Sequence, residues 1–256
     1  TELPRAEDVI IGGFSLGRVG EPIGIFYAHQ ALGVYATDES NVYRAPDGTE
    51  RKYLKGAATG EPFKGGDMIW LDVDGNGIID DADRLIIGDP NPKFIGGFTN
   101  RLAYKGISLN FSLYWSYGNK VMNELRRMRN RMFYTGNLGQ DALSRWREQG
   151  DVTNFPMVRY GDSMENFRPS TFNLEDGSFI RLKEVVLGYT LPTKLFQGSF
   201  VRSVSAYVSG TNLLTWSKYT GFDPEVNTST NPLVQGVDNG AFPKSRSYNF
   251  GINVQF

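Results

Sequence analysis

The stretch Ser247-Tyr-Asn-Phe-Gly-Ile-Asn-Val-Gln-Phe256 alternates apolar residues with polar or small ones without interruption. A period of two places successive side chains on opposite faces of a β-strand. In a soluble sandwich the apolar face would meet a protein core. In an outer-membrane barrel the apolar face would meet lipid, and the polar face would meet a wet lumen. The choice between these two surroundings decides both the fold and the function.

The same alternation predicts a hairpin with strands over 94–104 and 107–117, joined at Lys105-Gly106. Further strands are expected over 179–191 and 201–216. In the first of these the parity of the apolar residues changes near Lys183 or Glu184, which indicates a β-bulge. The 107–117 strand has the length of a tilted membrane-crossing strand, about 9–11 residues, whereas strands of soluble proteins usually have about 5–6.

Short turns alternate with long polar excursions along this part of the chain. The turns lie at 105–106 and 192–200, and the excursions at 118–177 and 217–243. Outer-membrane barrels combine short periplasmic turns with long extracellular loops, so the pattern favours a barrel over a soluble β domain. Within the first excursion, Met122 to Met132 and Asp141 to Gln149 are expected to be helical.

Composition excludes several classes of function. The formal net charge of −1 provides no global field that would attract nucleic acid. The chain has no Cys, which rules out disulfides and thiol catalysis. His29 is the only histidine, which argues against a Ser-His-Asp triad or a multi-histidine metal site, and we expect it to be an ordinary loop residue. No run of apolar residues has the length of a transmembrane helix.

An acidic stretch follows the spacing of an EF-hand calcium loop, with Gly77 where that loop turns sharply. The expected ligands are Asp72, Asp74, Asn76, Ile78 (through its backbone carbonyl), Asp80 and Asp83. Asp83 replaces the usual Glu, and its shorter side chain would lower calcium affinity or admit Mg²⁺. The alternative is an acidic turn held by Asx hydrogen bonds without metal. We expect a structural Ca²⁺ that neutralises the carboxylates and orders the loop.

Three other groups of residues have competing interpretations. Arg126, Arg127, Arg129 and Arg131 indicate a solvated helix face, with contact to lipopolysaccharide phosphates or to a partner protein as the alternative. Asp223 and Glu225 could form a glycosidase acid pair, but their position beside Pro224 favours a structural role. Aromatic residues at the outer strand ends are predicted to anchor the protein at a membrane interface, and sugar stacking is the alternative. These residues are Trp115, Tyr117, Trp216 and Tyr219.

Several motifs together resemble the SusC-like TonB-dependent transporters of Bacteroidetes. They occur in the order expected of that family and extend over nearly the whole chain. They include the acidic loop at 72–80, Ile87-Gly-Asp-Pro-Asn-Pro-Lys-Phe94, Arg181-Leu-Lys-Glu-Val-Val-Leu-Gly-Tyr-Thr-Leu-Pro192, Gly210-Thr-Asn-Leu-Leu-Thr-Trp216, Gly221-Phe-Asp-Pro-Glu-Val226 and the terminal Phe256.

The resemblance implies an all-β fold: the C-terminal strands of a 22-stranded antiparallel transmembrane barrel, with long extracellular loops that contain short helices. Residues 1–93 are then extracellular loops and short strands that include the acidic loop, and residues 94–256 are barrel strands with their loops. Phe256 resembles the signal that barrel-assembly machinery reads. The plug and most of the barrel are absent from this sequence, so we expect the chain to be a C-terminal portion.

The resemblance also implies a function and a set of partners. The function is TonB-dependent import of glycans or oligopeptides across the bacterial outer membrane, without catalytic residues. The implied partners are a SusD-like surface lipoprotein, the TonB complex acting through the missing N-terminal part, the remainder of the barrel, and outer-membrane lipid and lipopolysaccharide, with no nucleic acid. The alternative is a soluble, calcium-stabilised carbohydrate-binding β domain, and a glycosidase is a third hypothesis.

Overall fold

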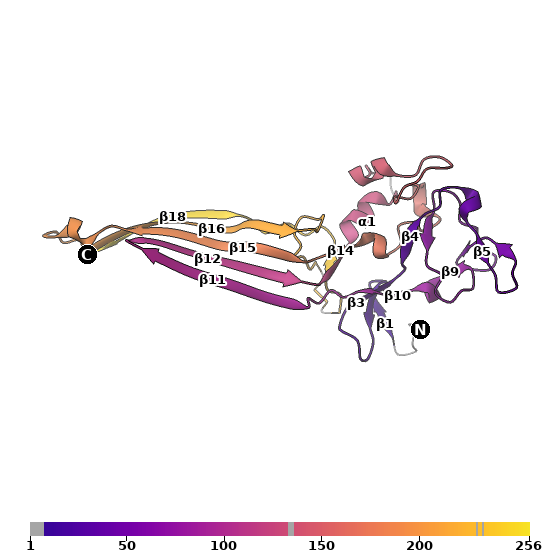
Figure 1. The fold of residues 1–256 in the computed structure, drawn as a ribbon, viewed down its shortest axis with the longest axis horizontal. Helices are drawn as coiled ribbons and strands as arrows, with labels where there is room; N and C mark the ends of the chain where they lie inside the picture. Colours follow the sequence, from indigo (N-terminus) through magenta and orange to yellow (C-terminus); the bar gives the residue numbers. More distant parts are fainter. Residues whose placement is uncertain (1–7, 133–135, 229, 232) are drawn as a thin grey trace. The chain divides into compact units, whose positions relative to one another are not determined.

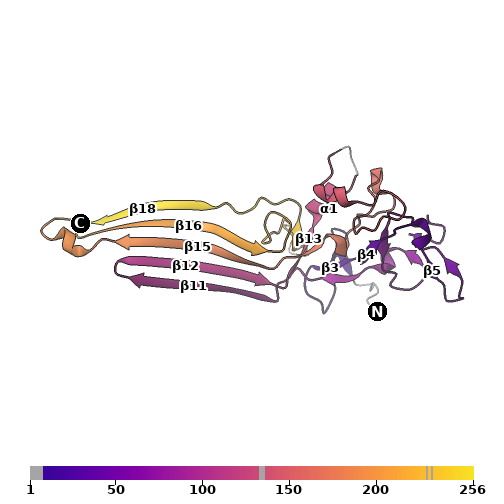
Figure 2. The ribbon, with the colours of Figure 1, turned by 45° about the horizontal axis from the view of Figure 1, so that its top comes forward.

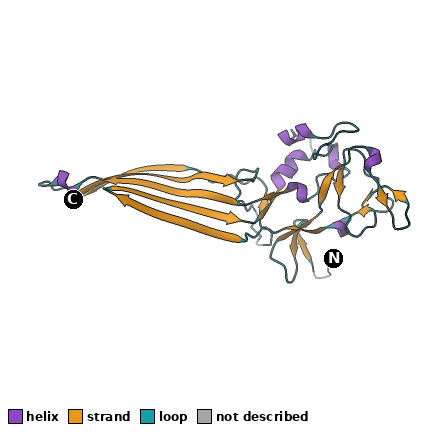
Figure 3. Cartoon of the chain, in the orientation of Figure 1, coloured by secondary structure: helices purple, strands orange, loops and turns teal. Residues whose placement is uncertain are grey.

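The computed structural model of the chain describes residues 8–132, 136–228, 230, 231 and 233–256. The chain divides into two compact units. The loop unit comprises residues 1–91, 120–175 and 226–240, and the sheet unit comprises residues 92–119, 176–225 and 241–256. Strands predominate in the sheet unit, whereas the loop unit mixes short strands with short helices (Figure 3). Among the described residues, no helix is both long and apolar enough to cross a membrane.

The sheet unit is built on one antiparallel sheet, whose strands lie side by side in Figures 1 and 2. In order across the sheet, the strands are β11 (Phe94–Tyr104), β12 (Ile107–Tyr117), β15 (Phe179–Thr190), β16 (Ser203–Ser217) and β18 (Ser247–Gln255). All five correspond to strands expected from the alternation of the sequence. A short 3₁₀ helix, η6 (Thr193–Phe196), lies in the connection from β15 to β16.

The turn between β11 and β12 confirms the predicted hairpin. Lys105 and Gly106 both have positive φ, 46° and 88°, as a type I′ turn requires. Tyr104 pairs directly with Ile107, so the loop contains only these two residues. A Cβ atom at position 106 would lie 2.6 Å from the carbonyl oxygen of Thr190, which leaves room only for glycine.

The two faces of the five-stranded sheet differ in polarity. On one face Phe250 and Ile252 of β18 are 81% and 74% exposed, and Phe94 of β11 is 65% exposed. On the opposite face, polar side chains bridge neighbouring strands, as in the 2.9 Å hydrogen bond from Arg101 Nε to Asn110 Oδ1. Soluble monomers rarely expose a continuous apolar surface of this kind. The apolar face therefore calls for an apolar environment that the described residues do not supply.

The predicted bulge in β15 is confirmed. The register between β15 and β16 shifts between Leu182 and Glu184, and the β12–β15 pairing shifts at the same level. Leu182 pairs with Leu214 before the shift, whereas Glu184 pairs with Thr211 after it. The bulge keeps apolar side chains on one face although the parity of the sequence changes.

The loop unit contains several small sheets instead of one large one. A four-stranded sheet joins β1 (Val9–Ile11), β2 (Ser15–Gly17), β3 (Ile25–Ala28) and β10 (Leu85–Gly88). A three-stranded sheet joins β14 (Leu174–Asp176), β13 (Lys120–Asn123) and β17 (Val237–Asp238). Three pairs complete the set: β4 (Ala31–Val34) with β8 (Met68–Trp70), β5 (Tyr43–Arg44) with β6 (Glu50–Arg51), and β7 (Leu54–Lys55) with β9 (Ile78–Ile79).

The cores of the loop unit draw on distant parts of the chain. One cluster of buried apolar side chains consists of Tyr35, Phe63, Met68, Trp70, Ile79 and Met164. Another consists of Phe14, Phe26, Ala28, Met122 and Val237. Because Met164, Met122 and Val237 come from the two long excursions, these excursions pack with the first part of the chain. The compact units therefore differ from the sequence division at residue 93, which follows chain order.

The helices are shorter than the sequence predicts. The expected helix at Met122–Met132 is α1 (Glu124–Asn130), because Met122 already belongs to β13 and Asn123 caps the helix by accepting from Arg126 N. The expected helix at Asp141–Gln149 is wrong. Only the 3₁₀ helix η3 (Gln140–Ser144) forms there.

A contact with another segment prevents the helix expected at Asp141–Gln149. The backbone N–H of Trp146 donates to Phe155 O over 2.9 Å, and the residue is 4% exposed. This bond holds the segment extended, and burial of the large indole outweighs local helix propensity. The remaining 3₁₀ helices are η1 (Asp38–Ser40), η2 (Asp81–Asp83), η4 (Tyr160–Asp162) and η5 (Thr171–Asn173).

Candidate functional site

The acidic loop runs from the end of β8 through β9 to η2. Among the predicted carboxylate ligands, Asp72, Asp74 and Asp83 come together, and each places a carboxylate oxygen within 4.8 Å of the other two. Asp83 is fully buried, Asp72 is half-buried and Asp74 is exposed. The group therefore extends from the protein interior to the surface, as in a site that an ion reaches from solvent.

Backbone hydrogen bonds fix two of these carboxylates. Asp83 accepts from Val73 N over 2.7 Å and from Asp80 N over 2.8 Å. Asp72 accepts from Gly75 N and Gly77 N, both over 2.8 Å. The loop is therefore shaped by Asx-type bonds, and its carboxylates hold their positions through the backbone.

Asp80 and Asn76 also make hydrogen bonds within the loop. Asp80 Oδ1 accepts from Ala82 N over 2.7 Å and caps η2. Asn76 Oδ1 accepts from Ile78 N over 2.6 Å, and Asn76 Nδ2 donates to Asp74 Oδ2 over 2.8 Å. Asn76 thus lies beside the three-carboxylate group, in contact with Asp74, and Asn76 and the Ile78 carbonyl stay predicted ligands.

The electrostatics of the group suit a hard divalent cation. Burial raises the pKa of Asp83, and the negative charges of Asp72 and Asp74 act in the same direction, against the backbone bonds from Asp80 and Val73. A cation would offset both burial and repulsion, because carboxylates are the ligands that Ca²⁺ and Mg²⁺ prefer. Such an ion would supply charge neutralisation and loop order, and the residues present fit that role.

Sequence reasoning missed a residue that supports the loop. The hydroxyl of Tyr43 donates to the carbonyl of Gly75 over 2.7 Å. The Tyr43 ring covers Gly77, where a Cβ atom would lie 2.5 Å from its Cδ1. An aromatic residue so far before the loop gives no sequence signal, since only the pairing of distant segments brings it there.

His29 is not an ordinary loop residue. It follows β3, is 4% exposed, and its Nε2 lies 2.8 Å from the carbonyl oxygen of Asp80. Burial, with a contribution from the positive charge of Arg168, lowers the pKa of His29 to about 4. The ring is therefore neutral at pH 7, and its Nε2 contacts both the Asp80 carbonyl at the end of the acidic loop and, over 3.2 Å, Arg168 Nη1.

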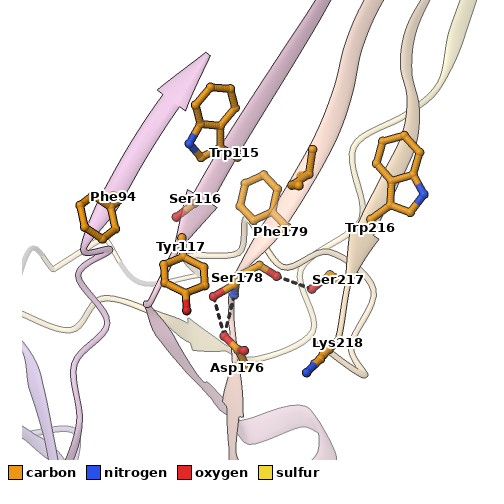
Figure 4. A pocket seen from close by; sticks show the side chains of 11 residues that line it. Phe94, Trp115, Ser116, Tyr117, Asp176, Ser178, Phe179, Trp216, Ser217 and Lys218 are labelled. Carbon is orange, nitrogen blue, oxygen red and sulfur yellow. Dashed lines mark hydrogen bonds between the residues drawn. The ribbon is translucent and has the colours of Figure 1, made fainter. Parts of the chain in front are cut away.

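Aromatic side chains gather where β12 and β16 end in the sheet unit. A cavity of about 750 Å³ is lined by Phe94, Trp115, Tyr117 and Trp216, shown in Figure 4. Phe94 pairs with Tyr117 and Trp216 pairs with Ile180, so these residues lie on the apolar face. Beside them, Ser178 donates to Asp176 and accepts from Ser217. This arrangement matches the aromatic band of a membrane interface.

Tyr219 differs from the other three predicted anchoring aromatics. It is 8% exposed and lines a separate, polar cavity of about 430 Å³. Its ring covers Gly221, where a Cβ atom would meet Tyr219 Cε1 at 2.4 Å. Tyr219 is thus a packing residue, because Gly221 leaves a recess that the ring fills.

Asp223 and Glu225 form ion pairs. Asp223 Oδ1 lies 2.5 Å from Arg181 Nη2, Glu225 Oε2 lies 3.1 Å from Arg181 Nη1, and Lys244 Nζ lies 2.6 Å from Glu225 Oε2. Burial opposes ionisation of Asp223, but hydrogen bonds from Glu225 N and from Arg181 outweigh it and lower the pKa of Asp223. A glycosidase acid requires a raised pKa. The arrangement agrees with the structural interpretation.

The arginines of α1, and Arg131 that follows it, are also paired. Arg126 Nε lies 2.9 Å from Asp141 Oδ2, Arg127 Nη2 lies 2.6 Å from Glu124 Oε2, and Arg131 Nε lies 3.3 Å from Asp162 Oδ2. Arg129 is farther from its acid, with 3.8 Å between Nη2 and Asp141 Oδ2. The run is therefore a network with acidic partners and not a free basic patch.

Comparison with known proteins gives consistent matches. No family model matches the chain. TonB-dependent receptor P3 of Formosa agariphila is 34% identical over 280 residues, covering 100% of this chain and 25% of the receptor. TonB-dependent receptor SusC of Bacteroides thetaiotaomicron is 27% identical over 190 residues, covering 73% of this chain and 17% of SusC.

A solved structure shares the fold. The structure of the RagAB peptide transporter matches with a TM-score of 0.71 at 24% identity, covering 96% of this chain and 24% of that chain. This chain thus spans about a quarter or less of the length of the proteins it resembles.

Proposed function

The chain belongs to the SusC-like TonB-dependent receptors of the outer membrane, and we propose that it forms barrel wall and extracellular loops of a nutrient importer. These relatives are receptors and transporters, and the chain is not an enzyme. In the proposed mechanism, a SusD-like surface lipoprotein and the barrel capture an oligomeric nutrient between them. TonB acting on a plug then opens a path through the barrel.

One observation carries this proposal. The five long strands present one continuous apolar face whose side chains are exposed or half-buried, and one polar face with hydrogen-bonded side chains. Burying such a face releases roughly 25 cal/mol per Å² of apolar surface. Lipid on one side and a wet lumen on the other satisfy both faces together, which a free domain in water does not do for this sheet.

The lengths of the connections between strands indicate which strand ends face the outside of the cell. The long excursions follow the ends of β12 and β16, where the aromatic cavity lies, while the short connections Lys105-Gly106 and 192–200 lie at the opposite strand ends. Long loops of outer-membrane barrels face outward. We infer that the acidic loop is extracellular and binds a structural Ca²⁺, with Mg²⁺ as the alternative. The imported class is a glycan or an oligopeptide.

Matched epitope insertions test the orientation. One epitope is placed after Val152, which is 93% exposed in the first excursion, and the other after Gly198, in the short 192–200 connection with open space around it. On intact cells, antibody is expected to label only the Val152 insertion. The Gly198 insertion is expected to become accessible once the outer membrane is permeabilised. Equal labelling of both on intact cells would contradict the proposal.

Detergent dependence separates the proposal from a soluble carbohydrate-binding domain. The purified protein is expected to stay monodisperse only in detergent, because the apolar face needs a cover. A folded monomer in plain buffer without partners would favour the soluble domain.

The glycosidase hypothesis requires hydrolysis that Asp223→Asn abolishes, and the paired state of Asp223 predicts no such activity.

A further inference from the structure

A polar cavity lies on the sheet unit at the ends of β15 and β16. Its volume is about 430 Å³, which falls within the range of roughly 300–1,000 Å³ typical of small-molecule sites. Arg181, Thr215 and Ser217 contribute from the strands, and 221–224, Pro243, Lys244 and Arg246 contribute from the loops. Arg181 pairs with Thr215 across the strands, on the face opposite Leu214 and Trp216. The cavity therefore belongs to the polar face of the sheet.

The central cation of this cavity, Arg181, is buried and held by two acidic side chains. The Arg181 side chain is 3% exposed, contacts both Asp223 and Glu225, and stacks with its Cζ 5.3 Å from the centre of the Phe179 ring. Asp223 Oδ2 also accepts from Lys244 N over 3.2 Å. These contacts tie the 221–224 segment to the 243–246 segment, so the groups that line the cavity are positioned before any ligand arrives.

The charges at the cavity do not cancel. Arg181 and Lys244 are matched by Asp223 and Glu225, with which they form ion pairs. Arg246 also lines the cavity, is exposed, and has neither a hydrogen bond nor an ion pair with any residue the structure describes. The exposed hydroxyl of Thr215 is likewise without a partner among those residues. One guanidinium and one hydroxyl are thus available to an anionic ligand.

Exposed aromatic surface borders these donors. Phe222 lines the cavity and is 67% exposed, and Phe242, next to the lining residue Pro243, is 97% exposed. A planar guanidinium binds carboxylates through two parallel hydrogen bonds. Flanking rings add contact area for the body of a sugar or a side chain.

We propose that this cavity binds a carboxylate group of the imported nutrient, with Arg246 as its principal contact and Thr215 as a second donor. The proposal rests on the transporter function, which turns the polar face toward the lumen. The carboxylate could belong to an acidic sugar or to the C-terminus of a peptide. The chemistry of recognition is the same in both cases, and ligand pairs separate them.

The test uses the intact receptor, purified in detergent with any co-purifying lipoprotein, and isothermal titration of two probe pairs. One pair is tri-galacturonic acid and its methyl ester, and the other is the peptide Ala-Ala-Phe and its C-terminal amide. Wild type is expected to bind the free acid of at least one pair about tenfold more tightly than its neutral counterpart, as a charge-assisted bond implies. The pair that shows the preference identifies the source of the carboxylate.

Arg246→Gln is expected to abolish that preference while leaving affinity for the neutral probe unchanged. Because Arg246 is exposed and unpaired in the described structure, the variant should fold normally. Arg202→Gln removes the same charge from an exposed residue outside the cavity and is expected to keep the preference. A wild type without preference in either pair, or a preference that persists in Arg246→Gln, would overturn the proposal. Surface labelling of the Val152 epitope reports separately on the transporter function.

Discussion

Arg181 and Asp223, 42 positions apart, form a buried ion pair in which Nη2 and Oδ1 are separated by 2.5 Å and the side chains are 3% and 8% exposed. The pair joins two of the motifs on which the family resemblance rests, one in β15 and one in the following loop. It anchors the loop that bears Phe222 to the polar face of the sheet.

Breaking this pair should destabilise the protein. Asp223→Asn leaves a buried guanidinium with reduced compensation, which typically costs about 3–5 kcal/mol. Thermal unfolding of the intact receptor in detergent would measure the change. Glu225→Gln is the matched control, because Glu225 is 34% exposed and an exposed pair contributes about 0–1 kcal/mol. Equal effects of the two substitutions would contradict the central role of Asp223.

The same pair predicts a dependence of stability on pH. The folded pKa of Asp223 lies below its ordinary value, which is about 3.9 for an unperturbed Asp. Ionised Asp223 therefore contributes stability above that value, and the contribution is lost as pH falls through the folded pKa. Between about pH 5 and pH 3, the unfolding midpoint of wild type should fall more steeply than that of Asp223→Asn. Parallel curves would show that ionised Asp223 does not contribute to the stability of the folded protein.

Metal binding at the acidic loop can be tested with a neighbouring control. Asp74→Asn removes one of three converging carboxylates and is expected to weaken Ca²⁺ binding by about tenfold or more, since ligand charge sets affinity in such loops. Asp81→Asn removes a carboxylate that is 83% exposed and pairs with Arg84 instead, so binding should be nearly unchanged. Calorimetry or terbium luminescence measures both. A wild type that binds no ion in millimolar calcium would refute the metal site.

Alternation made the sheet predictable. Each membrane-type strand repeats the same two-residue period over many residues, and a parity change marks the bulge at Leu182/Glu184. The hairpin was predictable because Lys105-Gly106 combines a two-residue loop with a glycine at a left-handed position. These are local properties, and a sequence displays them directly.

The rest depended on contacts between distant segments. The excursions pack with residues 1–91 through side chains such as Met122 and Met164, which carry no periodic signal. The expected helix at Asp141–Gln149 gave way to burial of Trp146. The acidic spacing indicated Asp72, Asp74 and Asp83 as one group, but it could not show that Asp80 turns to Ala82 N.

Gly77 is predicted to be irreplaceable for two separable reasons. Its φ of 78° disfavours any side chain, and a Cβ atom would lie 2.5 Å from the Tyr43 ring. Gly75 has a similar φ of 73° with nothing within 4 Å of its Cβ position, so it provides the control. Gly75→Ala should cost only the left-handed strain of about 1 kcal/mol. Gly77→Ala should cost clearly more in thermal unfolding, and it should weaken metal binding if Tyr43 holds the loop. Equal effects would show that the ring moves aside freely.

The contact between Gly96 and Trp115 on the apolar face leads to a prediction that has its own control variant. They pair across β11 and β12, and the indole covers the glycine so closely that a Cβ atom would lie 2.4 Å from Cζ2. Gly96→Ala should therefore displace the indole, with an overpacking penalty of about 1–3 kcal/mol. If Trp115 faces lipid, quenching of tryptophan fluorescence by brominated lipid should change in this variant. Gly97→Ala, whose Cβ would make a 3.4 Å contact with Leu113 O on the opposite face, should leave the quenching unchanged. Quenching insensitive to both substitutions would place the Trp115 ring outside the bilayer and would remove the apolar face from contact with lipid at this level.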